Sequence, residues 1–163
     1  MEKEYLIKPE LKINENGTPS WYLNGKLHRE DGPAIEHPNS YKEWYLNGKR
    51  HREDGPAIEH PNGFKAWYLN GKLHREDGPA IEYSDSDSDG TNTKEWYLNG
   101  ERHREDGPAI EYSDSDDTKE WYLNGKRLSE DIIISQRDKY PELYESWITY
   151  QVTYQVIRQV MHS

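Results

Sequence analysis

KEWYLNGKRHREDGPAIE, at residues 42–59, is one of five related units that fill most of this 163-residue chain. Each unit begins near a tryptophan, and these lie roughly 23 to 29 residues apart, at Trp21, Trp44, Trp67, Trp96 and Trp121. The run HREDGPAIE occurs four times, beginning at His28, His51, His74 and His103. A base, a cation and carboxylates in one run would suggest an active site if they occurred once. Repetition at this period instead predicts a repeat protein, in which each unit buries its apolar residues against its neighbours.

An Asn-Gly pair lies between two short extended runs in every unit. It is the strongest local signal for a β-hairpin, because a type I′ turn needs positive φ at both central residues. A two-residue turn at Asn47-Gly48 fixes the register of its hairpin. The opposed pairs are then Leu46–Lys49, Tyr45–Arg50 and Trp44–His51.

Extending the same register outward predicts that the charges of HRE pair with those that precede the tryptophan. The predicted pairs are Glu43–Arg52, Lys42–Glu53, Glu95–Arg104, Lys94–Glu105, Lys65–Glu76 and Lys119–Glu130. Opposite charges are favourable when they are directly opposed on antiparallel strands. HRE is therefore expected to be the second strand of the hairpin, which Asp-Gly-Pro ends because proline cannot donate to the ladder.

Together the units predict a mainly β fold. We expect a single-layer twisted β-meander of about five hairpin repeats with a C-terminal α-helical cap. The chain divides into an N-terminal cap strand at residues 1–16, five hairpin repeats at 17–131 and a C-terminal helical segment at 132–163. Tryptophan, leucine and histidine should line one face and tyrosine the other, and two strands per repeat should advance the sheet by roughly 10 Å.

The pattern WYLNGKxHREDGPA resembles repeats of bacteriophage and giant-virus proteins, and it looks like a variant of the MORN repeat. The resemblance covers about residues 17–131 and rests on the Trp, Asn-Gly, His and Gly landmarks. Two departures are that the spacing from Trp to Asn-Gly is one residue longer, and that HREDG replaces a tight His-Gly-x-Gly. The resemblance implies a meander of hairpins that serves as a scaffold for protein contacts, sometimes linked to membranes, and it implies no chemistry.

Residues 141–161 have the spacing of an amphipathic helix. Pro141 suits a first helical turn, and Glu142 is favoured there by the helix dipole. Strict alternation over residues 148–156 leaves a strand as the rival, but so long a strand would be rare. The candidate interface residues on this segment are Trp147, Tyr150, Tyr154, Ile157 and Met161. They would either cap the last repeat or bind a second copy or another protein.

The composition excludes several classes of function. The chain has no cysteine, which excludes disulfide frameworks and thiolate metal sites. Its net charge of −10 argues against direct binding of nucleic-acid phosphates. It has neither an apolar leader nor an apolar run long enough for a membrane span. We therefore expect a soluble protein of the cytoplasm, which is the host cytoplasm if the protein is viral.

Candidate chemistry is sparse. The four equivalent histidines would lie about 10 Å apart, too far to share one metal ion. No catalytic constellation is evident, so we expect neither an enzyme nor a cofactor. DSDSDG matches the opening of a calcium loop and makes Asp85, Asp87 and Asp89 weak calcium candidates. Position twelve of that loop is Trp96 in place of an acid, which favours a solvated connection.

The sequence thus predicts a non-enzymatic repeat scaffold that binds a protein partner. The resemblance implies a viral or phage accessory protein acting on a host factor, such as one of host defence. The alternative is a structural protein that forms a homodimer or larger oligomer through its C-terminal helix. Calcium binding and acidic mimicry of nucleic acid are more distant, since lysine and arginine interleave with most of the acids.

Overall fold

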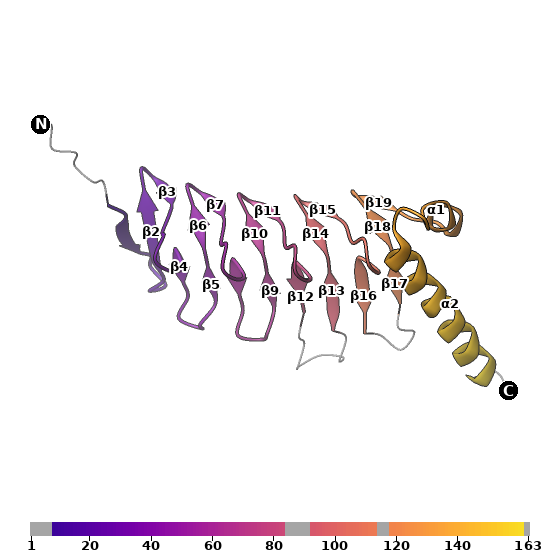
Figure 1. The fold of residues 1–163 in the computed structure, drawn as a ribbon. Coiled ribbons are helices and arrows are strands. Elements are labelled where there is room, and N and C mark those ends of the chain that lie inside the picture. Colours follow the sequence, from indigo (N-terminus) through magenta and orange to yellow (C-terminus); the bar gives the residue numbers. More distant parts are fainter. Residues whose placement is uncertain (1–7, 84–91, 114–117, 162–163) are drawn as a thin grey trace, which may run out of the picture.

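The computed structural model describes residues 8–83, 92–113 and 118–161, with side chains up to residue 153. It is a row of antiparallel hairpins that form an open sheet, followed by two helices (Figure 1). The predicted mainly β meander with a helical cap is confirmed.

An 11-stranded sheet runs the length of the molecule. Its path is β1 (Glu10–Ile13), β2 (Pro19–Leu23), β4 (Ile35–Glu36), β5 (Lys42–Glu43), β8 (Ile58–Glu59), β9 (Lys65–Ala66), β12 (Ile81–Glu82), β13 (Thr93–Glu95), β16 (Ile110–Tyr112) and β17 (Lys119–Glu120), with β3 (Lys26–Leu27) paired to β2. Beside it lie four two-stranded ribbons. They are β6 (Tyr45–Leu46) with β7 (Lys49–Arg50), β10 (Tyr68–Leu69) with β11 (Lys72–Leu73), β14 (Tyr97–Leu98) with β15 (Glu101–Arg102), and β18 (Tyr122–Leu123) with β19 (Lys126–Arg127).

The hairpin turns form as the Asn-Gly pairs predict. Asn47 has a φ of 52° and Gly48 a φ of 79°, as a type I′ turn requires. Tyr45 faces Arg50, and Leu46 faces Lys49. One step further out, the backbone N–H of His51 donates to the carbonyl of Trp44 at 3.1 Å. The predicted register is therefore confirmed as far as that pair.

Beyond the tryptophan the predicted register is wrong. The N–H of Arg52 donates to the carbonyl of Tyr68 at 3.0 Å, so the chain after His51 crosses to the next repeat. Glu43 faces Ile58 instead, because the AIE strand of the same repeat returns beside it. The six predicted pairs Glu43–Arg52, Lys42–Glu53, Glu95–Arg104, Lys94–Glu105, Lys65–Glu76 and Lys119–Glu130 are not formed, since other residues face these glutamates and lysines in the sheet.

The charges before the tryptophan do pair, but with different partners. Lys42 faces Glu59 of its own repeat on one side and Glu36 of the preceding repeat on the other. Continued along the sheet, this gives one row of alternating sign: Glu36, Lys42, Glu59, Lys65, Glu82, Lys94, Glu111 and Lys119. Each charge within the row lies between two opposite charges, which stabilises this register.

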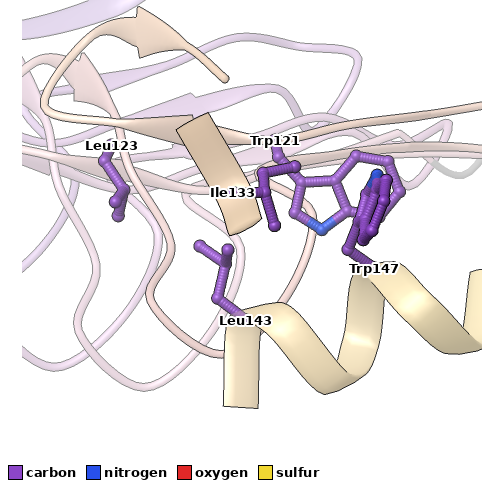
Figure 2. Packing of buried hydrophobic residues seen from close by; sticks show 5 residues of the cluster. All are labelled: Trp121, Leu123, Ile133, Leu143 and Trp147. Atoms are coloured by element: carbon purple, nitrogen blue, oxygen red, sulfur yellow. The ribbon is translucent and has the colours of Figure 1, made fainter. Parts of the chain in front are cut away.

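Two helices follow the last hairpin: α1 (Glu130–Ser135) and α2 (Pro141–Met161). The predicted helix is confirmed, and the rival strand over residues 148–156 is wrong. Figure 2 shows the apolar cluster that joins the helices to the fifth repeat, formed by Trp121, Leu123, Ile133, Leu143 and Trp147. The first half of α2 thus covers the end of the sheet, and the helix then runs away from it (Figure 1).

Candidate functional site

The HREDGPA segment is a compact loop organised around its arginine. The guanidinium carbon of Arg52 lies 4.1 Å from the ring centroid of Trp44. Its Nε donates to Asp54 Oδ1 at 2.9 Å, and its Nη1 donates to the Pro56 carbonyl at 3.2 Å and to Glu59 Oε1 at 2.7 Å. Arg29, Arg75 and Arg104 make the same contacts to tryptophan, aspartate and proline. One guanidinium therefore links the tryptophan that precedes the loop to the aspartate and proline within it.

The glycine of this loop lies close against the same arginine. A Cβ added at Gly55 would lie 2.9 Å from Arg52 Cζ. The guanidinium therefore lies close to both the indole and the glycine backbone. Gly-Pro here makes room for the cation, which is a different role from the strand terminator expected from sequence.

The histidine that begins each HREDGPA segment links its repeat to the next. The N–H of Asn47 donates to His28 Nδ1 at 3.1 Å, and three further Asn–His pairs repeat this bond. His28 Nε2 lies 3.5 Å from Glu30 Oε1. Nδ1 must be the unprotonated acceptor in this arrangement. Among the residues that the structure describes, no group of three or more His, Asp or Glu side chains could hold a metal ion.

A second network lies on the opposite face of the sheet. Glu43 is buried, and its Oε2 accepts hydrogen bonds from Arg50 Nη2 at 3.0 Å and from the hydroxyl of Tyr45 at 2.9 Å. Burial, with the carboxylate of Glu43 nearby, raises the pKa of Tyr41 to about 12. Glu95 and Arg102 repeat the pair at 3.1 Å.

Sequence reasoning missed this network, although the repeats carry its signal. Units with glutamate before the tryptophan have arginine after Asn-Gly-Lys or Asn-Gly-Glu: Glu43 with Arg50, Glu95 with Arg102, and Glu120 with Arg127. The other two units have a small residue and leucine: Ser20 with Leu27, and Ala66 with Leu73. The two positions change together, as expected of side chains that touch.

Aromatic side chains gather on the face that holds this network, which we call the tyrosine face. It comprises Tyr41, Tyr45, Phe64, Tyr68, Tyr83, Tyr97, Tyr112 and Tyr122, all partly or well exposed. Arginines lie between rings of successive repeats: Arg50 Cζ is 5.9 Å from the Tyr45 centroid and 5.6 Å from that of Tyr68. Phe64 and Tyr83 pack at 4.9 Å. Aromatic rings of successive repeats are thus connected at several points along this face.

The other face carries a row of open hollows between successive HREDGPA loops. One hollow of about 780 Å³ is lined by Trp67, Leu69 and His74, with the exposed acids Glu53 and Asp54 among the residues at its rim. Equivalent hollows of about 610 and 710 Å³ flank it. Tryptophan, leucine and histidine do share one face, as predicted.

The structure describes the side chains of two of the predicted interface residues, Trp147 and Tyr150, and both pack against the fifth repeat. Trp147 is buried in the cluster with Trp121, and the Tyr150 ring lies 5.1 Å from that of Trp121. Val152, two residues on, is 60% exposed. For three of the candidates, Tyr154, Ile157 and Met161, the structure describes the helical backbone only. The calcium candidates Asp85, Asp87 and Asp89 lie outside the described residues.

No model of a known protein family matches the chain, and no curated protein matches it. In the described part of the chain, no helix is long and apolar enough to cross a membrane.

Proposed function

We propose that this chain is a non-enzymatic repeat scaffold that binds a protein partner through its tyrosine face. The observation that carries the proposal is the row of partly exposed rings, with Arg50 between Tyr45 and Tyr68 and Arg102 between Tyr97 and Tyr122. Tyrosine and arginine are enriched where proteins bind one another. Tyrosine offers a large contact area with only two side-chain torsions to order. A rigid row of such rings therefore suits a protein surface.

The groups capable of acid–base chemistry are engaged in holding the repeats together. The imidazole Nδ1 atoms accept backbone N–H groups, and the loop arginines are bound on several sides. A catalytic base needs a free lone pair directed at a substrate. The Nδ1 atoms of these histidines are used instead for contacts between repeats, which favours a binding function over catalysis.

The kind of partner rests on the resemblance of the repeats. Because they resemble repeats of bacteriophage and giant-virus proteins, we place the protein among viral accessory proteins that bind a host or viral protein in the host cytoplasm. A factor of host defence is the partner that we would test first.

Affinity capture with matched variants tests this proposal. Tyr68→Ala combined with Tyr83→Ala removes two neighbouring rings of the tyrosine face. Glu53→Gln combined with Glu76→Gln alters the rim of the opposite face and is the control. We expect the tyrosine variant to retain a captured host protein about tenfold less well or worse, and the control to retain it fully. Equal capture by all three proteins would contradict the proposal.

Self-association through α2 is the second candidate, and exposed Val152 favours it. This residue belongs to an apolar stripe that continues toward the C-terminus of the helix. Val152→Lys should then convert an oligomer into a monomer, as measured by light scattering. An unchanged mass would remove this candidate.

A further inference from the structure

One end of the sheet is covered by other elements and the opposite end is exposed. At the C-terminal end, Trp121 and Leu143 are buried where the helices cover the last repeat. At the other end lies β1, the indigo strand nearest the N-terminus in Figure 1, and all four of its residues are exposed. Leu11 is 47% exposed and Ile13 is 66% exposed. Among the described residues β1 pairs only with β2, so its outer edge can accept another strand.

The direction of the backbone groups of β1 follows from its pairing. Leu11 lies opposite Trp21, and Ile13 lies opposite Pro19. The N–H of Trp21 donates to the carbonyl of Ala34 on the far side, and proline has no N–H. Residues of an antiparallel strand direct their backbone groups alternately to one neighbour and the other. Leu11 and Ile13 therefore direct their N–H and C=O groups toward the free edge.

The charges of β1 are complementary to those of a second β1 strand when the two strands meet in one particular register. Lys12 Nζ lies 2.8 Å from Glu10 Oε1, so both side chains are on one face of the strand. In an antiparallel pair of two β1 strands with the two-fold axis at Leu11, Glu10 of each copy faces Lys12 of the second copy. With the axis at Lys12 or at Glu10, like charges would oppose each other, which is unfavourable.

We propose that two copies of this chain join edge to edge through β1, with Leu11 opposite Leu11 of the second copy. Each Leu11 donates its N–H to the other and accepts in return, and the N–H of Ile13 extends the ladder. The two sheets become one continuous sheet with the helices of each copy at its outer ends. The contact is the same on both copies, so the assembly closes as a two-fold dimer. This interface is independent of partner binding and of the exposed stripe of α2. It would place two tyrosine faces on one particle.

Leu11→Pro tests the backbone part of the proposal. It removes an N–H that points to the free edge, and such an edge position tolerates proline without loss of the β1–β2 ladder. We expect sedimentation equilibrium to show a dimer for the unaltered chain and a monomer for Leu11→Pro, with equal circular dichroism. Leu11→Ala keeps the N–H and is the control, which should still dimerise. A monomeric unaltered chain, or a dimer that survives Leu11→Pro, would overturn the proposal.

Charge reversal tests the register. Glu10→Lys and Lys12→Glu each place like charges in opposition twice, so each should weaken self-association about tenfold. A mixture of the two variants opposes the introduced lysine of one chain to the introduced glutamate of the other and should recover a heterodimer. Mixing cannot repair the contact between positions 10 and 12 within a chain, so recovery can only come from pairing between chains. If the mixture stays monomeric while the unaltered chain dimerises, this register is wrong. Neither result depends on capture of a host protein.

Discussion

Glu43 and Arg50 of the second repeat correspond to Ala66 and Leu73 of the third. If the two side chains depend on each other, the cost of replacing them can be predicted. Arg50→Leu would leave the buried carboxylate of Glu43 without its cation and should destabilise the fold by about 1.5–3 kcal/mol. The value is below that of a fully buried pair because the Arg50 side chain is 37% exposed. Glu43→Ala should cost less, about 1 kcal/mol, since Arg50 can turn to water. The double variant reproduces Ala66 and Leu73 of the third repeat and should cost about 1 kcal/mol or less.

A double-mutant cycle in urea measures the coupling. Neighbouring residues of one network typically show interaction energies of about 0.5–3 kcal/mol. We expect the loss of stability in the double variant to be smaller than the sum of the two single losses by about 1.5–3 kcal/mol. Additive effects, with the double variant the least stable of all, would refute the explanation of why these positions change together.

Three further predictions concern the loops and the tyrosine face. Gly55→Ala should lower the free energy of unfolding by about 1–3 kcal/mol, because the new Cβ would meet a guanidinium at 2.9 Å; urea unfolding measures it. The folded-state pKa of Tyr41 is raised from 10.0 to about 12, so its contribution to stability is complete below pH 10 and is lost between about pH 10 and 12. Alkaline unfolding should therefore be less steep in Tyr41→Phe. Calcium should leave the melting temperature unchanged in both the native chain and Asp87→Asn, whereas a native-state site at 100 times its dissociation constant would add about 2.7 kcal/mol.

Features set by neighbours in sequence were predictable. Asn47-Gly48 imposes its turn through positive φ at both residues, so the hairpin register follows without knowledge of the rest of the fold. The helix over residues 141–161 follows likewise from the spacing of its apolar residues.

The partners of the outer charges were not predictable in the same way. Both Glu53 and Glu59 carry the charge that Lys42 needs, so the charge pattern is satisfied by either register. What decides between them is that the chain crosses to the next repeat after His51, where Arg52 bonds to Tyr68. That crossing depends on a neighbouring repeat, and a single unit contains no signal for it. The contacts of the arginine loops lie within one repeat, and they were missed because HRE was expected to be a strand paired with the residues before the tryptophan.

In these repeats, the residues that stabilise the fold are different from the residues that can distinguish one partner from another. HREDGPAIE is identical in four copies, and its arginine, glycine and histidine all make contacts within or between repeats. The hollows that it forms are therefore nearly alike along the sheet and offer the same chemistry at each step. The tyrosine face differs from copy to copy: the cross-strand pair is His37 with Tyr41 in one hairpin and His60 with Phe64 in the next. A partner that binds at one position along the row must read a surface that varies, so we expect its specificity to lie on the tyrosine face.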